Sequence, residues 1–328
     1  GEPHWGHILV GIIKAIINDT YLLNNEKVEK IKAGFDVNGI GVEALIDSKF
    51  KPKNLTEKLQ LCKKFINDNI MKWEDVPNKI KRKLDFENHW ATNHDYYSKS
   101  VWWAFKRLYY MGFIYKGKKI CNYSVGIGTN ISNSEAKENT LKLSLDCITF
   151  SYKLKDFNDA NLIVWTTTPW TIPSNTICCV GNINYVLFEY ENKKYVISEF
   201  AYNSNKKKVS LANFDKSKCN IIRTFNGSEL VGLEYEPIFT YNNFRQDKIY
   251  HGDFIDEQKG SGVTHIVPAF GEEDMKICRD NNITDYEMKN LFDPLDEKGN
   301  YTNLCPELEG KYIFDKDTVN IICKMIRD

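Results

Sequence analysis

The chain has 328 residues, of which 42% are hydrophobic and 13% aromatic, and this is enough to bury the cores of two domains. Lysine and arginine number 44, as do aspartate and glutamate, so no overall charge indicates a nucleic-acid partner and any such surface must be local. The nine cysteines are scattered, odd in number and without a C-x-x-C pair, which argues against a disulfide framework and a cysteine zinc site. We therefore expect reduced thiols in a cytoplasmic protein. We also expect no membrane span, because no run of about 18 apolar residues is present.

The first part of the chain carries helical patterns. Residues 8–17 place apolar side chains three and four positions apart, which predicts a helix with one buried face. The same spacing predicts further helices over 55–70 and 96–111, the second of them capped at its C-terminus by Gly112.

The pattern changes near residue 140, where short β-type segments take over. Residues 161–168 are β-branched and apolar as in a buried strand, and residues 185–200 are typical of a hairpin that turns at Glu191–Lys194. Further strands are predicted within 141–154, 235–241 and 261–270. We expect a mostly helical domain over residues 1–139 and a mostly β domain over residues 140–328.

The opening stretch GEPHWGHILVG places His4 and His7 on either side of Gly6, where Pro3 prevents an earlier helix start. Amides at a helix N-terminus bind anions, imidazoles can donate to phosphate, and Gly6 lets a flat group approach the backbone. This favours a nucleotide site. A metal pair would need further ligands, and no H-E-x-x-H motif supplies them; two ordinary helix-start histidines are the remaining alternative.

Three further stretches carry polar groups that suit a binding site. Asp36 follows Gly34 in a glycine-rich turn, where it either holds a small cation or bonds its own backbone. Thr166, Thr167 and Thr168 end a predicted strand. Their hydroxyls suit a ribose, a base and a terminal phosphate, although threonine is also common in strands for packing reasons.

The last such stretch is GSGVTHIVPAFGEED, residues 260–274. A tight turn at Gly260 and Gly262 precedes His265, and Asp274 follows at a predicted helix start. An imidazole and a carboxylate in one pocket could bind an amine and position water. Spacing alone does not establish an acid–base pair, and a single strand histidine is more often structural.

Taken in order, these stretches resemble the isoleucyl-tRNA synthetases of class I. PHWGH is similar to the His-x-Gly-His signature, and GFDVNGIGVE to Gly-Trp-Asp-x-His-Gly-Leu-Pro-x-Glu. Residues 100–117 and 123–136 resemble the lead into the editing insertion, and WTTTPWTIPSN and GSGVTHIVPAFGEED resemble its two pocket motifs. The Trp-Thr-Ile-Pro-Ser-Asn run favours the isoleucyl branch, and SNSEA is similar to the eukaryotic cytosolic form.

The resemblance implies an α/β + β architecture. A partial Rossmann-type synthetase core, mostly helical, would occupy residues 1–139, and a β-barrel-like editing domain residues 140–328. The family's Lys-Met-Ser-Lys-Ser signature does not occur in the chain, so we expect a piece of a longer enzyme.

For the core, the resemblance implies that His4, Gly6 and His7 bind ATP, which acts with Mg²⁺, and that Asp36 holds the ammonium of isoleucine with Glu43 nearby. Phe35, Asn38 and Gly41 replace the usual Trp, His and Pro, so the shape of this site departs from the family pattern. Some relatives carry a zinc knuckle near residues 124–129; this stretch has no cysteine, and we predict no zinc there.

For the editing domain, the family is itself the standard example of why a second site is needed. One methylene separates isoleucine from valine, and this difference supports only roughly 150-fold discrimination by binding. The resemblance implies that Asp274 binds the α-amino group of misattached valine and that Thr166, Thr167 and Thr168 hold the terminal adenosine and the ester. Trp170 would shape the pocket and His265 would help exclude isoleucine. No general base is assigned, since water held by the threonines and tRNA hydroxyls could suffice.

The function implied is that of an isoleucine–tRNA ligase segment with substrates ATP, isoleucine and tRNA(Ile), and with hydrolytic editing of Val-tRNA(Ile). We expect the segment alone to retain editing. The alternatives are a stand-alone deacylase that edits in trans, for which no downstream Lys-Met-Ser-Lys-Ser would be encoded, and a catalytically inactive tRNA-binding module.

Overall fold

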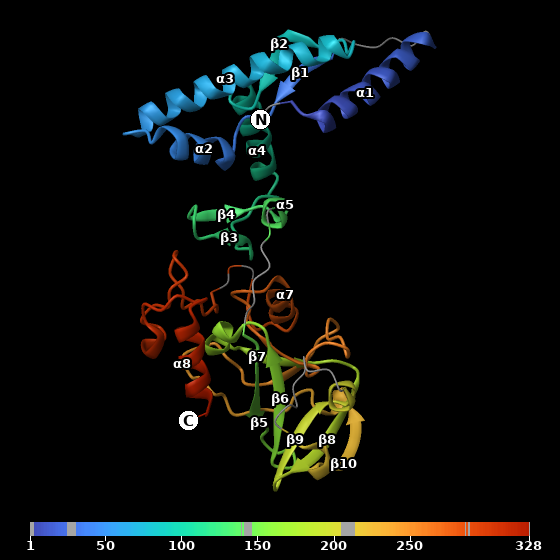
Figure 1. Cartoon of the computed structure of the whole chain (residues 1–328), viewed down its shortest axis with the longest axis vertical. Helices are drawn as coiled ribbons and strands as arrows, with labels where there is room; N and C mark the ends of the chain where they lie inside the picture. Colours follow the sequence, from blue (N-terminus) through green and yellow to red (C-terminus); the bar gives the residue numbers. More distant parts are fainter. Residues whose placement is uncertain are drawn as a thin grey trace. The chain divides into compact units, whose positions relative to one another are not determined.

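The computed structural model describes residues 3–24, 31–138, 140, 146–204, 214–285, 287 and 289–327. By its internal contacts the chain divides into two compact units, residues 1–115 and 116–328 (Figure 1). Residues 116–138, which the sequence analysis grouped with the helical part, thus pack with the second unit. The assignment of separate functions to 1–139 and 140–328 stays a prediction.

The first unit is built on a parallel strand pair. Its elements are α1 (Trp5–Leu23), β1 (Lys32–Phe35), α2 (Ile40–Phe50), α3 (Leu55–Lys79), β2 (Asp85–Ala91) and α4 (Asp95–Tyr110). Because β1 and β2 run parallel, the residues that follow them meet at one edge. The predicted helices over 55–70 and 96–111 are confirmed, and Gly112 has the positive φ of +75° that suits a residue following a helix.

The predicted buried face of α1 is wrong. Of the residues described in this helix, only Gly11 and Ala15 are buried, because periodicity reveals an apolar face but not whether anything covers it. By length and composition, α1 could also cross a membrane, because its mean hydropathy stays high although Lys14 and Asp19 interrupt a continuous apolar run. The expectation of no membrane span stays a prediction. Core helices and signal sequences meet the same criterion, so the finding assigns no membrane role.

The second unit combines several helices with short strands. It begins with β3 (Asn122–Ser124), β4 (Thr129–Ile131) and α5 (Asn133–Lys137). The strands that follow are β5 (Ile148–Lys153), β6 (Ala160–Thr166), β7 (Ile177–Val180), β8 (Asn184–Tyr190), β9 (Lys193–Ser198), β10 (Asn220–Asn226), β11 (Ile249–His251) and β12 (Val263–Ile266). The helices are α6 (Glu199–Asn203), α7 (Glu272–Asp280), α8 (Lys316–Arg327) and the 3₁₀ turns η1 (Pro169–Ser174), η2 (Lys216–Lys218), η3 (Gly227–Glu229) and η4 (Pro306–Leu308).

These strands form two main sheets, in the orders β10-β8-β9-β6-β5 and β11-β7-β12. Over the residues that the structure describes neither sheet closes on itself, so the fold is a mixed one of helices and sheets, and a barrel-like shape is not confirmed. The predicted hairpin is confirmed, with its turn at Glu191 and Asn192, both at positive φ. The strand predicted over 235–241 is wrong: only Tyr235 makes an isolated bridge, and Pro237 cannot donate to a ladder.

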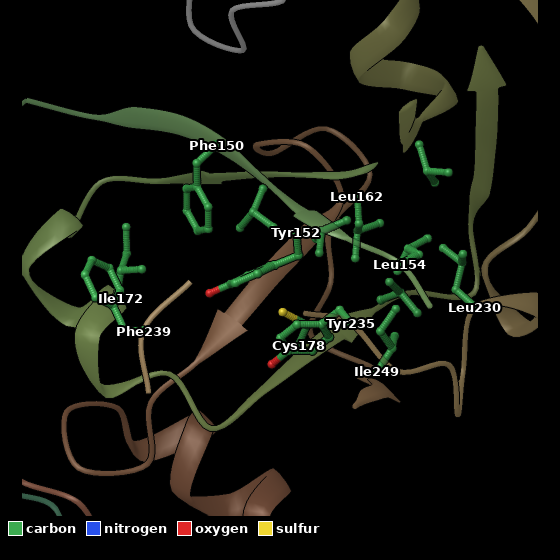
Figure 2. Close-up of a cluster of buried hydrophobic side chains, with 14 of the residues drawn as sticks. Phe150, Tyr152, Leu154, Leu162, Ile172, Cys178, Leu230, Tyr235, Phe239 and Ile249 are labelled. Carbon is green, nitrogen blue, oxygen red and sulfur yellow. The ribbon is translucent and has the colours of Figure 1, made fainter. Parts of the chain in front are cut away.

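The core lies between the two sheets (Figure 2). Leu162 and Val164 of β6 share this cluster with Cys178 and Val180 of β7. The alternate residues of the same strands are buried as well, Ile163 in a cluster that includes residues of α6 and Ile177 in one that includes residues of α7. Both faces of these strands are therefore covered, which is why they read as unbroken apolar runs rather than as alternating ones.

Candidate functional site

A cavity of about 320 Å³ lies in the second unit where β6 ends beside β12. Its lining residues are Trp165, Thr166, Thr167, Thr168, Trp170, Thr171, Lys259, Gly260, Val263, Thr264, His265, Val267, Phe270 and Asp274. Every residue that the sequence analysis assigned to editing is among them. Residues 166 and 274, far apart in the sequence, are thus brought to one cavity by the packing of two sheets and a helix.

The threonines form a hydrogen-bonded chain. The Thr168 amide donates to Thr166 Oγ1 at 3.1 Å, and the two hydroxyl oxygens are 3.2 Å apart. The Thr171 hydroxyl oxygen, on η1, lies 2.9 Å from the Thr168 carbonyl oxygen and also contacts His265. A hydroxyl has only one proton, so Thr171 donates to one of these two groups at a time.

His265 is held by this hydroxyl. Its Nε2 lies 2.7 Å from Thr171 Oγ1, and the tautomer of the ring decides which of the two atoms donates. Nδ1 is buried without a partner among the described residues. Burial lowers the pKa of His265 to about 4, so the imidazole is neutral at pH 7 and weakly basic.

Asp274 lies in the first turn of α7, where a carboxylate is favoured by the helix dipole. Its Oδ2 accepts the Val267 amide at 2.7 Å. Burial raises its pKa to about 6, despite that hydrogen bond. Gly271 makes room for the carboxyl group: a Cβ there would lie 2.8 Å from Asp274 Cγ. At pH 7 the group is mostly an anion that can bind an ammonium.

Trp170 forms an aromatic side of the cavity. Its ring centroid lies 5.0 Å from that of Phe270 and 6.0 Å from that of Phe314. The Tyr301 hydroxyl donates to the Trp170 carbonyl, so the segment near the C-terminus holds η1 in place. Sequence reasoning missed Thr171 and Phe270, although both stand inside the quoted motifs, because their contacts arise only on folding.

The first unit has a smaller candidate site at the edge where β1 and β2 end. Asp36 lines a cavity of about 270 Å³ whose other lining residues are mostly apolar. Thr92, just after β2, accepts the Val37 amide at 3.0 Å and lies 3.4 Å from Asp36 Oδ1, so it steadies the turn that carries Asp36. Glu43 instead pairs with Lys58 at 3.0 Å and is not among the residues lining this cavity; its substrate role stays a prediction.

The two opening histidines cap α1. His4 Nδ1 accepts the Gly6 amide at 3.1 Å, and the rings of His4 and His7 lie 3.6 Å apart. The pKa of His7 is lowered by desolvation first and by His4 second. Among the residues that the structure describes, no three His, Cys, Asp or Glu side chains gather as a metal site. The ATP-binding role of His4, Gly6 and His7 stays a prediction.

The chain matches the family of tRNA synthetases class I (I, L, M and V) over residues 1–294. It is 32% identical to the isoleucine–tRNA ligase of Bdellovibrio bacteriovorus, covering 97% of this chain and 30% of that protein. It is also 32% identical to the cytoplasmic isoleucine–tRNA ligase of Saccharomyces cerevisiae, covering 98% of this chain and 31% of that protein. Bacterial and eukaryotic relatives are thus equally similar, and the expected eukaryotic cytosolic character stays a prediction.

Among solved structures, GlLeuRS-CP1 is similar with a TM-score of 0.41 and 15% identity, over 56% of this chain and 96% of that one. The editing domain of Plasmodium falciparum cytosolic leucyl-tRNA synthetase is similar with a TM-score of 0.30 and 18% identity, over 51% of this chain and 66% of that one. The chain spans about a third of the length of the curated relatives it matches. The family match covers most of the chain, and the protein belongs to the class I tRNA synthetases of the I, L, M and V group.

Proposed function

We propose that the cavity of the second unit hydrolyses the ester bond of a misacylated tRNA, and that its substrate is Val-tRNA(Ile). One observation carries the proposal: three threonines, a neutral histidine and a half-buried carboxylate line a single cavity. Its volume is at the lower end of the range for small-molecule sites, which suits an aminoacyl group together with part of the terminal adenosine.

Each group has a role that follows from its protonation state. The Asp274 carboxylate, ionised at pH 7, binds the α-ammonium of the valyl group. The threonine hydroxyls both donate and accept, so they suit the ribose hydroxyls and the ester. Water attacks the ester carbonyl carbon, the bond from that carbon to the ribose oxygen breaks, and the ribose oxygen takes the proton, which releases valine and free tRNA.

His265 is unsuited to act as general base, because a pKa of about 4 leaves it weakly basic at neutral pH. We propose that His265 forms the side of the cavity that excludes isoleucine. The Thr171 contact fixes its ring, so the extra methylene of isoleucine would meet a side chain that cannot move aside. Water would then be oriented by the threonines and by hydroxyls of the tRNA itself.

The parent enzyme would be an isoleucine–tRNA ligase of the cytoplasm. Its first unit would contribute Asp36 to hold isoleucine, and His4, Gly6 and His7 to bind ATP with Mg²⁺ as substrate. The curated relatives, named isoleucine–tRNA ligases, support this assignment. We infer that the present segment contributes editing by itself, while aminoacylation requires parts that those longer relatives contain.

The test is deacylation of Val-tRNA(Ile) and Ile-tRNA(Ile) by the 328-residue chain. We expect hydrolysis of the valyl ester only, and loss of that activity in Asp274→Ala, because the ammonium loses its counter-ion. Asp280→Ala is the matched control, since Asp280 is on the same helix, exposed and paired with Lys276. Equal rates in the parent chain and Asp274→Ala would refute the assignment of this pocket.

A further inference from the structure

We propose that Ser261 is a positioning residue that fixes the threonines and His265 relative to each other; this rests on the proposed editing function. The cavity needs such a residue because its two sides belong to different sheets. The threonines lie at the end of β6 and just after it, in the five-stranded sheet, whereas His265 lies on β12, in the three-stranded sheet. No ladder of backbone hydrogen bonds between β6 and β12 is present in the described sheets to set this spacing.

Ser261 joins these two sides through its hydroxyl. The side chain is almost fully buried, with 1% exposed. Its Oγ accepts the amide of Trp165, the residue immediately before Thr166, at 3.2 Å, and donates to the Val263 carbonyl at 3.3 Å. One atom therefore bonds both the end of β6 and the start of β12.

The backbone of Ser261 adds a third attachment. Its carbonyl accepts the Ser198 amide, at the end of β9, at 3.0 Å. Ser198 itself caps α6 through its side chain. The position is thus tied to the strand next to β6 as well, and the hydroxyl cannot move without disturbing that attachment.

The two flanking glycines keep Ser261 in close contact with its neighbours. Gly260 and Gly262 have φ of +60° and +75°, which glycine adopts without strain. A Cβ on Gly260 would lie 3.0 Å from the Trp165 ring, and one on Gly262 would lie 2.5 Å from Ser198 Cβ. The close approach on both sides leaves the Ser261 hydroxyl little freedom, as a positioning group requires.

Loss of the Ser261 hydroxyl would change the geometry around the reacting ester. Removing the hydroxyl leaves the Trp165 amide without its acceptor, and an unpaired amide seeks another partner. The end of β6 then moves relative to β12, carrying Thr166 with it. A misplacement of about 1 Å can cost about 100-fold in rate, so the loss should fall on kcat more than on KM.

The experiment compares Ser261→Ala and the near-isosteric Ser261→Cys with the parent chain. Thr318→Val is the control: Thr318 is fully buried, donates to the Tyr312 carbonyl at 2.7 Å and does not line the cavity. The measurements are kcat and KM for Val-tRNA(Ile), the valyl-to-isoleucyl rate ratio, thermal unfolding, and hydrogen exchange of the Trp165 amide by NMR.

We expect Ser261→Ala to lower kcat roughly 10- to 100-fold with KM nearly unchanged, to lower the valyl-to-isoleucyl ratio, and to speed exchange at Trp165. Thr318→Val should lose thermal stability alone. If Ser261→Ala does not fold, Ser261→Cys carries the same expectations, because sulfur is a weak acceptor. A purely structural role, with lower stability but unchanged kcat and ratio in the folded fraction, would overturn the proposal.

The exchange measurement separates this proposal from the function on which it rests. A parent chain that hydrolyses neither ester refutes the proposed function, and exchange at Trp165 then still decides whether the hydroxyl holds the end of β6. Unchanged Trp165 exchange in both serine variants overturns the positioning role, whatever the activity of the parent chain.

Discussion

At the residue scale, Asp274 and His265 are shifted in opposite ways by the same cause. Burial penalises the charged form of each, so the pKa of Asp274 rises to about 6 while that of His265 falls to about 4. Near pH 7 the cavity therefore holds a carboxylate beside a neutral imidazole. That combination suits the ammonium of the proposed substrate, because the neutral imidazole adds no competing positive charge. The pKa shifts follow from depth in the fold rather than from residue type.

The raised pKa of Asp274 predicts how stability depends on pH. Between about pH 4 and 6 the folded chain binds more protons at this group than the unfolded chain does, so the free energy of unfolding falls as pH rises through this window. Asp274→Asn should therefore stabilise the fold at pH 7 by about 1–2 kcal/mol, with the gain vanishing near pH 4. Denaturation at several pH values measures this; an equal difference at pH 4 and 7 would show that the carboxyl group is not shifted.

At the element scale, α7 presents Asp274 because Gly271 precedes it without a side chain. Gly271→Ala places a Cβ against the carboxyl group, so we expect the side chain to swing away and deacylation to fall by about 10-fold or more. Thermal stability should change little, since the clash is with one side chain. Gly126→Ala is the matched control, having open space at its Cβ position and no positive φ; deacylation should stay at the parent rate in this variant, and a similar rate in Gly271→Ala would contradict the account.

At the scale of the whole molecule, burial is concentrated in the second unit. Leu162, Val164 and Cys178 are fully buried there, whereas α4 of the first unit has no buried residue. We expect amides of β6 and β7 to exchange with solvent far more slowly than those of α1 and α4, because slow exchange follows packed strands. Hydrogen exchange followed by mass spectrometry checks this on the intact chain, and similar protection in α4 and β6 would disprove it.

The same distribution shows how far the sequence could predict this protein. Order and motif spacing along the chain identified the family, three of the four helices described in the first unit and the hairpin at Glu191, because these depend on local patterns. The residues predicted for editing all line one cavity, while their editing roles stay a prediction. The prediction of a strand over 235–241 was wrong, because Pro237 cannot donate to a strand ladder although its neighbours are apolar. The prediction of a buried face on α1 was wrong, because apolar periodicity does not show whether another element packs against that face.

By itself, the sequence determined which chemical groups this chain has and in what order: threonines after a strand, a histidine on another and an aspartate at a helix start. Tertiary structure alone decided that Thr171 contacts His265 Nε2, that Gly271 makes room for Asp274, and that Ser261 joins two sheets. The physical reason is that protonation, close approach and hydrogen-bond partners depend on distances between residues such as 165 and 261, and these distances exist only once both sheets have packed around one core.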